Sequence, residues 1–251
     1  MNWLSNYRKS IFIFSLSTVL SVPLLSVYTP QAQAGFLGEG IRNMLRRERQ
    51  QGRASGRSRG GAIRDESCVS PDSKPFMALV PEDNQGTTIA AHPTFWFYLP
   101  LGRSEKVTQA RFVLFDENQS SVIAQKMVEL PDAPGIVSVK LPETEQSLEV
   151  DKRYTWHFSV ICDELERSRN PWLSGLVERV ETHPQLVQQL ENLPESEQYL
   201  AFAEHGISQE ALTLLAQHRS IHSDDWTDML AYFELEELAE AEIIQLNPER
   251  E

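Results

Sequence analysis

Cysteine is scarce in this sequence: Cys68 and Cys162 are the only two among 251 residues. Two cysteines without a second pair make a poor zinc site. An even number of cysteines in an oxidising compartment instead favours a disulfide. We therefore predict a Cys68–Cys162 disulfide, which would stabilise the fold by about 4 to 5 kcal/mol on a chain-entropy argument. A reactive thiol or a metal-ligand role is the alternative.

Long apolar runs are missing after the N-terminal region. Within residues 1–34, Arg8 and Lys9 precede an apolar run of about 16 residues, and the AQA motif at 32–34 is a pattern that signal peptidase accepts. A retained membrane anchor is the alternative, but a helix that spans a bilayer needs about 20 apolar residues. We therefore predict a cleaved signal peptide over residues 1–34, export to the periplasm or the outside of the cell, and no transmembrane segment after cleavage.

Basic residues are rare in the C-terminal part of the chain. Residues 181–251 hold 16 acidic residues against two arginines, whereas residues 35–65 hold eight arginines against three acids. The formal net charge of −13 argues against nucleic acid as a partner, because phosphate binding needs a basic face. The Arg-, Gly- and Ser-rich stretch at 35–65 predicts a basic disordered linker. Contact with an anionic lipid or a cell-wall polymer is the alternative for that stretch.

Motifs for catalysis and cofactor binding are also lacking. The sequence contains no phosphate-binding glycine loop, no nucleotide fingerprint and no HExxH. The G-x-S-x-G match at 56–60 has neither the strand before it nor the helix after it that a nucleophile elbow requires. His218 and His222 lie near two aspartates, but the serines among them are typical of a loop rather than a metal site. We predict no cofactor and no metal, and the catalytic residues of any enzymatic activity stay unknown.

Residues 66–180 consist of short strand-like runs separated by turn residues. Apolar and polar residues alternate along 136–141 and 154–161. Pro, Gly, Asp and Asn fall between the runs. The pattern predicts an all-β sandwich of the immunoglobulin/fibronectin-like kind with about seven strands. The expected strands are 76–80, 94–99, 110–115, 122–130, 136–141, 154–162 and 176–180.

A helical period replaces the strand signals in residues 181–251. Apolar residues recur every three to four positions in four short segments, one closed by Gly206 and the next begun at Ser208. The segment EHGISQEALTLLAQH is similar to a single tetratricopeptide repeat, and one copy is too few for a solenoid. We predict a small, acidic, α-helical C-terminal lobe that follows the sandwich.

Aromatic residues make up only 9% of the chain, yet four of them stand together in the stretch HPTFWFYLP. On a strand, Phe95 and Phe97 face one side while Trp96 and Tyr98 face the other. One set must fill the core between the sheets, and the other needs either the helical segment as a cover or a ligand. We favour the cover, and we keep Trp96, Tyr98 and Trp172 as a candidate binding surface.

Several blocks of the sequence are similar to one known family. The blocks are ALVPEDNQGTTIAAHPTFWFYLP, ARFVLFDENQ, PGIVSVKLP, LEVDKRYTWHFSVICD, GLVERV and YLAFAEHGISQEALTLLAQH. With these blocks in this order, the chain resembles the Domain of Unknown Function 928 family from about Cys68 to the last helix. The resemblance implies export and a cyanobacterial source, and it supplies no activity and no catalytic residue.

Three functions remain open on the sequence alone. The first is an exported non-enzymatic binding or scaffold protein of the cell envelope, whose partner is another envelope protein or a second copy of the chain. The second is a carbohydrate-binding module that uses strand aromatics, and the third is an envelope polysaccharide hydrolase. Glycosidases need two carboxyl groups about 5 to 10 Å apart in a cleft, which spacing along a sequence does not reveal. We favour the first function and keep polysaccharide as a candidate partner.

Overall fold

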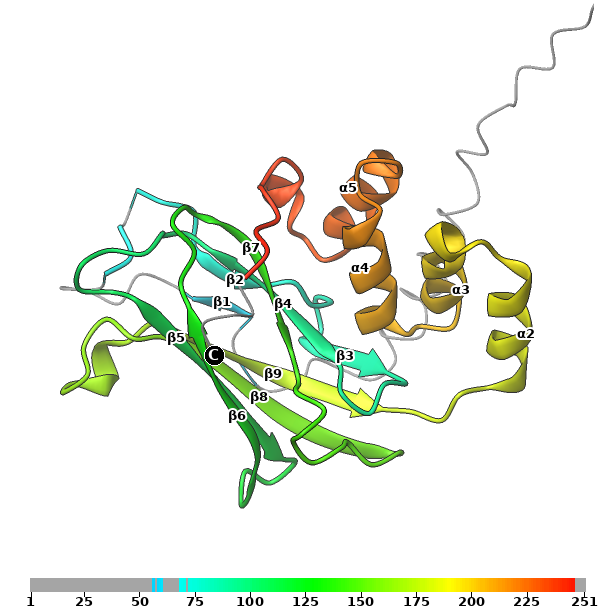
Figure 1. The fold of residues 1–251 in the computed structure, drawn as a ribbon, viewed down its shortest axis with the longest axis horizontal. Helices are drawn as coiled ribbons and strands as arrows, with labels where there is room; N and C mark the ends of the chain where they lie inside the picture. The colour runs from blue at the N-terminus through cyan, green and yellow to red at the C-terminus, as the bar shows by residue number, and fades with distance from the viewer. Residues whose placement is uncertain (1–55, 57, 61–67, 71, 247–251) are drawn as a thin grey trace, which may run out of the picture. The chain divides into compact units, whose positions relative to one another are not determined.

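The fold consists of two β-sheets packed face to face, with helices against the outer side of one of them (Figure 1). The computed structural model describes residue 56 and residues 58–60, 68–70 and 72–246. All of these belong to a single unit of the chain. The predicted signal peptide at 1–34 lies outside the described residues, as does most of the predicted linker at 35–65.

The first sheet has four strands in the order β1-β2-β4-β7, all antiparallel. They are β1 (Arg59–Gly60), β2 (Phe76–Ala78), β4 (Thr94–Leu99) and β7 (Gly135–Lys140). A segment near the C-terminus extends this sheet beside β7, because the backbone NH of Ile136 donates to the Glu242 carbonyl at 2.7 Å and that of Ile244 donates to the Ile136 carbonyl at 2.8 Å. Gly135 permits this close approach, since a β-carbon there would stand 2.8 Å from the Glu242 carbonyl oxygen.

The second sheet has five strands in the order β3-β9-β8-β5-β6. They are β3 (Gln85–Thr88), β9 (Trp172–Arg179), β8 (Lys152–Val160), β5 (Gln109–Asp116) and β6 (Val122–Glu129). Strand β3 runs parallel to β9, and the other neighbours are antiparallel. Neither β1 nor β3 was expected from the sequence, because both fall in stretches rich in the turn and loop residues that usually separate strands.

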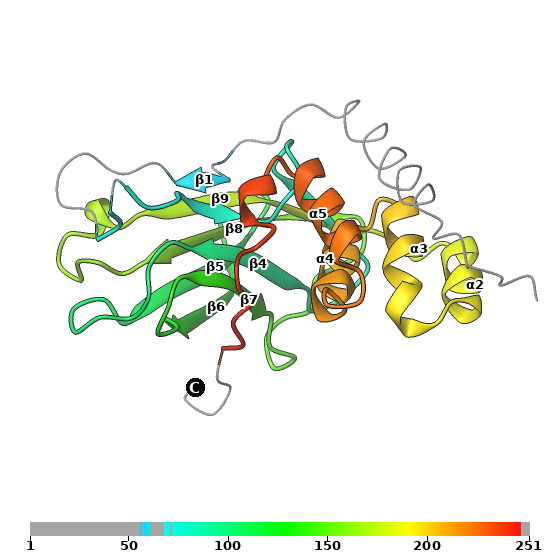
Figure 2. The same cartoon turned by 90° about the horizontal axis from the view of Figure 1, so that it is seen from above.

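Four helices follow the last strand. They are α2 (Pro184–Asn192), α3 (Gln198–Glu204), α4 (Ser208–Gln217) and α5 (Ser223–Tyr232), with short 3-10 turns η1 (Arg167–Arg169), η2 (Glu195–Glu197) and η3 (Glu236–Leu238). Helix α2 packs on α3, α3 packs on α4, and α4 lies against β3 and β4 (Figure 2). Gly206 turns the chain between α3 and α4 with a φ of +72°, the left-handed conformation that glycine adopts without strain.

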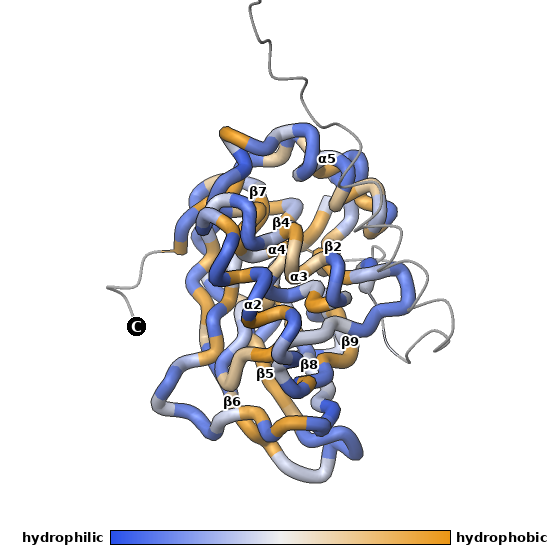
Figure 3. The backbone as a smooth tube through the Cα atoms, turned by 90° about the vertical axis from the view of Figure 1, so that its right-hand side faces the viewer, coloured by the Kyte–Doolittle hydropathy of each residue, from blue (hydrophilic) through white to orange (hydrophobic). Residues whose placement is uncertain are grey.

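The helices are amphipathic. Figure 3, viewed from the side on which α2 lies, shows polar and apolar residues mixed along α2. Leu186 is the fully buried residue of that helix, whereas α4 buries Ala211, Leu212 and Leu215 among others. Burial therefore increases from α2 towards the sheet, as expected for a helical layer whose stability comes mainly from packing. Among the described residues, no helix is both long and apolar enough to cross a membrane.

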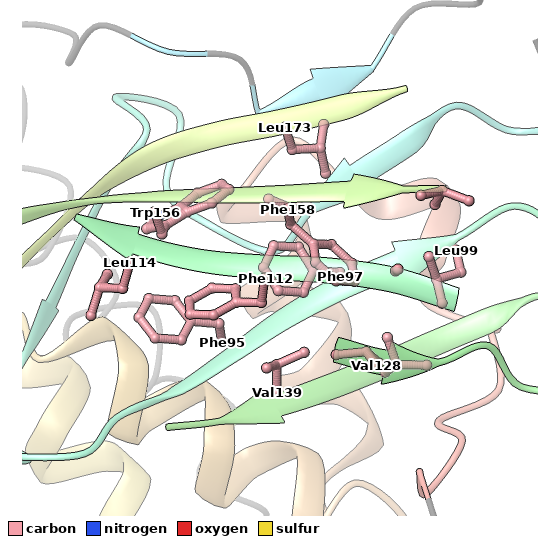
Figure 4. Close-up of a cluster of buried hydrophobic side chains, with 14 of the residues drawn as sticks. Phe95, Phe97, Leu99, Phe112, Leu114, Val128, Val139, Trp156, Phe158 and Leu173 are labelled. Atoms are coloured by element: carbon pink, nitrogen blue, oxygen red, sulfur yellow. The ribbon is translucent and has the colours of Figure 1, made fainter. Parts of the chain in front are cut away.

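The core between the two sheets is aromatic (Figure 4). Phe95 and Phe97 of β4 point into it, and Phe97 stacks on Phe158 of β8 with ring centroids 4.0 Å apart. Phe95 lies 4.7 Å from Phe112 of β5, also centroid to centroid. Burying one such side chain stabilises the fold by about 1.5 to 3 kcal/mol.

A second core lies between the four-stranded sheet and the helices. It contains Trp96 and Tyr98 of β4, which are 5% and 8% exposed, together with Leu212 and Leu215 of α4 and Trp226 of α5. The aromatic row of β4 is therefore buried on both sides, by the other sheet and by the helical layer. This is the arrangement that the sequence analysis favoured for the stretch HPTFWFYLP.

The predicted disulfide is present. Cys68 and Cys162 are bonded, and their Cα atoms are 5.6 Å apart, well within the range that a disulfide spans. The bond joins the segment that precedes β2 to the end of β8, so it links the two sheets.

The predicted fold class is wrong. The protein is not an all-β immunoglobulin/fibronectin-like sandwich of about seven strands followed by a small helical lobe. The described residues form an α+β fold with a four-stranded and a five-stranded sheet and four α-helices. The physical reason is that the helices are a layer of the fold itself, since they bury the outer side of the four-stranded sheet in a second core. Part of the predicted linker is also structured, since Arg59 and Gly60 pair with Met77 and Phe76.

Candidate functional site

Among the described residues, most of the outward side of the five-stranded sheet is uncovered, although α4 packs on its edge strand β3. Within the described part of the chain, α4 packs on β3 and β4, and the other helices pack on one another. Two large apolar side chains remain exposed on the uncovered side, Met127 at 39% and Trp172 at 40%. A large exposed aromatic on a sheet is the kind of feature that marks a binding surface.

Strand pairing gathers side chains from distant parts of the sequence on this open side. Successive side chains of a strand point to opposite faces, so Arg111 and Val113 of β5 lie on the face away from Phe112 and Leu114; Arg111 is half-buried and Val113 is buried. Arg111 is in register with Ser159 of β8, and Ser159 is in register with Trp172 of β9. Val113 is in register with His157 in the next row.

These side chains line a groove of about 300 Å³, which we call the Trp172 groove. Its lining residues are Arg111, Val113, Phe115, His157, Ser159, Arg167, Asn170 and Trp172. The His157 ring stacks on Trp172 with 13° between the planes and 6.0 Å between the centroids, and Phe115 meets His157 edge to face at 5.4 Å. Three rings from three neighbouring strands thus form a continuous aromatic floor.

The groove carries positive charge. Arg111 and Arg167 both line it, and no aspartate or glutamate does. Among the described residues, neither arginine forms an ion pair, whereas Arg103, Arg153 and Arg169 each do. Two uncompensated guanidinium groups on a chain with a formal net charge of −13 make the groove a local exception to an acidic molecule.

A hydrogen-bonded loop holds Arg167 beside the sheet. The buried Asn170 side chain accepts from the backbone NH of Cys162 at 2.8 Å and of Asp163 at 2.9 Å, and it donates to the Asp163 carbonyl. The Asp163 carboxylate accepts from the backbone NH of Glu166 and of Leu165, and these bonds lower the pKa of Asp163. Because the disulfide begins at Cys162, the loop is covalently anchored where it leaves β8.

His157 lies in the middle of the groove floor. Burial beneath its neighbours lowers the pKa of His157 below its ordinary value, so the imidazole is neutral at neutral pH. Its Nε2 atom is buried and has no hydrogen-bond partner among residues whose positions are described. A neutral ring in this position contributes an aromatic face and a hydrogen-bonding nitrogen, and leaves the positive charge to the two arginines.

The three residues proposed as a binding surface fall on opposite sides of the molecule. Trp96 lies beneath the helices, where its indole Nε1 donates to the Thr213 hydroxyl at 3.0 Å. Tyr98 lies in the same core, and burial raises the pKa of its hydroxyl. Trp172 stands on the open face of the other sheet. The structure therefore brings Trp172 together with residues that the sequence analysis did not select.

The missed residues are Arg111, Phe115, His157 and Arg167. A signal was present for three of them, because Arg111 and Phe115 alternate with buried neighbours along β5 and His157 alternates along β8. What the sequence did not give is the pairing of β5, β8 and β9, which decides that these outward residues meet. Arg167 sits in a loop and carried no signal of its own.

The weak metal hypothesis at His218 and His222 meets no ligand cluster. Within the described residues, no group of three or more His, Cys, Asp or Glu side chains is placed to hold a metal ion. His218 Nδ1 lies 3.0 Å from the Leu214 carbonyl, and His222 Nδ1 lies 3.8 Å from the Asp225 carboxylate. Asp225 in turn accepts from the Tyr199 hydroxyl.

The fold and the groove together define an α+β protein with one sheet covered by helices and the other open around a cationic aromatic groove. The chain belongs to the Domain of Unknown Function (DUF928) family, whose model matches residues 54–243. This range begins before β1 and ends in the segment that pairs with β7, so the family domain contains both sheets and all four helices. The comparison with curated proteins gives no match.

Proposed function

We propose that the protein is an exported, non-enzymatic binding protein of the cyanobacterial cell envelope and that its Trp172 groove binds a carboxylated polysaccharide. The observation that carries this proposal is one groove that combines an exposed tryptophan with two arginines that form no ion pair among the described residues. The N-terminal pattern of residues 1–34 and the single disulfide support the exported location.

The chemistry of the groove fits a sugar acid. The apolar face of a sugar ring packs on a flat aromatic side chain, and Trp172 offers one that is 40% exposed. Arginine binds a carboxylate through two parallel hydrogen bonds, which Arg111 and Arg167 are free to make among the described residues. Ser159 adds a hydroxyl that can exchange hydrogen bonds with sugar hydroxyls.

Binding rather than hydrolysis is the activity that this lining supports. Glycosidases place two carboxyl groups on either side of the bond that they cleave. The lining of the Trp172 groove includes no aspartate or glutamate. The groove therefore has the parts for holding a polysaccharide and lacks the acid and base for cutting one.

Titration of the disulfide-bonded chain with polygalacturonate oligomers tests the proposal, with tryptophan fluorescence or calorimetry as the readout and neutral dextran oligomers as the comparison. We expect binding of the acidic oligomer only. Trp172→Ala and Arg111→Ala should each weaken it about tenfold or more, which corresponds to about 1.4 kcal/mol. That loss is the scale of one charge-assisted hydrogen bond or one aromatic contact.

Matched substitutions elsewhere control for general effects. Arg103→Ala removes an arginine that is ion-paired with Asp132 outside the groove, and Ile221→Ala trims an apolar side chain that is 70% exposed on the helical side. Both should leave the affinity for polygalacturonate unchanged. Equal binding of dextran and polygalacturonate, or full affinity in Trp172→Ala, would contradict the proposal.

A further inference from the structure

A second cavity lies between the helices and the segment that leads into β4. Its volume is about 330 Å³. Its lining residues are Ala90, His92, Pro93, Thr94, Gln198, Phe202, Gln209, Glu210, Thr213, Leu214 and Gln217. We call it the Glu210 cavity. It belongs to the helix-covered side of the molecule, so it is separate from the Trp172 groove.

Glu210 is the one carboxylate in this lining, and its two oxygens have different surroundings. Oε1 accepts three hydrogen bonds, from the Thr88 hydroxyl at 2.6 Å and from the backbone NH groups of Ile89 at 3.2 Å and Ala90 at 3.0 Å. Oε2 is buried and has no hydrogen-bond partner in the part of the chain that the structure describes. Burial raises the pKa of Glu210, which reflects the cost of keeping this charge away from water.

A purely structural role explains the contacts of only one of the two oxygens of the Glu210 carboxylate. The three bonds to Oε1 tie α4 to the chain just after β3, and the amide oxygen of a glutamine would accept the same bonds. The second oxygen and the negative charge serve no contact within the described residues. A buried acceptor without a partner costs about 1 to 3 kcal/mol, and Glu210 is also one of the residues that line the cavity. Together these two observations point to a ligand.

The lining also indicates the charge of that ligand. It includes no lysine and no arginine, and its remaining polar groups are the amides of Gln198, Gln209 and Gln217, two hydroxyls and the His92 ring. The His92 ring lies 3.2 Å from the Glu145 carbonyl, measured from Nε2. An anion would meet an uncompensated carboxylate here, whereas a cation would neutralise it.

We propose that the Glu210 cavity binds a primary alkylammonium group, with the Glu210 carboxylate as its counter-charge. The ammonium has three donors, which match the free carboxylate oxygen and the neighbouring amide and hydroxyl oxygens. Its alkyl stem packs against Phe202, Leu214 and Pro93, which form the apolar part of the lining. The group belongs either to a free alkyl diamine or to a lysine side chain of a peptide.

Calorimetry and thermal denaturation of the full disulfide-bonded chain test this, with 1,4-diaminobutane and a short lysine peptide as the cationic probes. Butane-1,4-diol has the same length without the charge and serves as the matched probe. We expect at least one cationic probe to bind and to raise the melting temperature in a concentration-dependent way, and the diol to do neither. Binding of the peptide alone would assign the site to a lysine of a partner protein, and binding of the diamine would assign it to a small molecule.

Two variants connect the binding to the cavity. Glu210→Gln keeps an acceptor for the three donors and removes the charge, and Leu214→Phe narrows the cavity without touching Glu210. Each should weaken binding of the cationic probe at least tenfold. Glu191→Gln, the same change at an exposed site on α2, should have no effect.

Several results would overturn this inference. They are failure of both cationic probes to bind at millimolar concentration, equal binding of the diol, and unchanged affinity in both Glu210→Gln and Leu214→Phe. None of them bears on polygalacturonate binding at the Trp172 groove, because the two sites share no lining residue.

Discussion

The outer faces of the two sheets differ in how much of their surface is exposed. On the four-stranded sheet, Trp96 is 5% exposed beneath the helices, and on the five-stranded sheet Trp172 is 40% exposed. Both are tryptophans that point away from the core between the sheets, at the beginning or middle of a strand. The difference between them comes from the described helices, which cover the four-stranded sheet at Trp96 and contact the five-stranded sheet at its edge strand β3, away from Trp172.

This comparison teaches that an outward aromatic on a strand has no fixed meaning by itself. Trp96 has a hydrogen-bond partner for its indole NH and apolar neighbours from the helices, so it contributes to stability. Trp172 is 40% exposed, a histidine stacks on it, and it shares its groove with two arginines that form no ion pair among the described residues. The surroundings in space separate the two, and they include residues far away along the chain.

The largest effect is expected when the helices that cover the four-stranded sheet are removed. A chain that ends after Glu181 lacks all four helices and the segment that pairs with β7. It should expose Trp96 and Tyr98, each of which buries about 150 to 250 Å² when packed, and it should be insoluble or bind hydrophobic dyes strongly. Solubility, dye fluorescence and denaturant titration would measure this. A soluble fragment that unfolds cooperatively would contradict the shared core.

Truncating one tryptophan at a time compares the two faces directly. Trp96→Ala should lower the free energy of unfolding by about 3 to 5 kcal/mol, because it leaves a large cavity beneath the helices. Trp172→Ala should lower it by less than about 1 kcal/mol, since the side chain is partly exposed. Urea denaturation of both variants gives the two values. Similar losses in the two variants would show that the faces differ less than their exposure suggests.

Removing the disulfide tests whether it supports the Trp172 groove on the five-stranded sheet. Cys68→Ser with Cys162→Ser should cost about 2 to 5 kcal/mol in the free energy of unfolding. It should also loosen the loop from Asp163 to Asn170 that carries Arg167. We therefore expect weaker polygalacturonate binding in the folded double variant and unchanged binding of the cationic probe at the Glu210 cavity. Loss of both binding activities in a chain that is still folded would argue against a local effect.

The smallest expected effect is a change in how the free energy of unfolding depends on pH. It comes from Glu210, on the side of the molecule that the helices cover. The pKa of Glu210 is raised above its usual value of 4.5, so the folded chain holds this proton more tightly than the unfolded chain. Its contribution to stability is fully present below pH 4.5 and is lost as the pH rises through the raised pKa. Glu210→Gln has no such loss, so its stability relative to the unsubstituted chain should increase from pH 4 to pH 8.

The size of that gain is about 1.4 kcal/mol for each unit by which the pKa is raised. His92 is the other titratable group in the cavity lining, and both proteins contain it. Glu191→Gln at its exposed site should show no such trend. A difference between Glu210→Gln and the unsubstituted chain that stays constant across this pH range would contradict the buried charge.

Local patterns in the sequence gave correct predictions where residues close together in the chain decide the structure. The alternation of Phe95, Trp96, Phe97 and Tyr98 predicted two buried sets, and the structure places one set in each core. The disulfide followed from the number of cysteines. Gly206 was expected to end a helix, and α3 does end just before it.

The rest depended on contacts between distant segments. β3 was missed because its partner β9 lies far along the chain and pairs with it in parallel, which leaves no hairpin signal in the sequence. The helices were predicted, and the aromatic row of β4 indicated that they cover that strand. Their packing on β3 and the pairing of β1 were not encoded in any local pattern, so the number of strands and the fold class were wrong. The Trp172 groove was missed for the same reason, since Arg111, His157 and Trp172 come from three strands that only the sheet brings together.

The backbone bonds between Ile136 and the segment Glu242–Ile244 have a consequence for the order of folding. The N-terminal strands leave the ribosome first. One edge of β7 then has no strand partner until residues 242–244 have been made. Strand β3 waits in the same way for β9. Pairings of such long sequence separation form slowly and leave strand edges exposed to other chains in the meantime. During synthesis the edges of β3 and β7 therefore stay unpaired until β9 and residues 242–244 have been made.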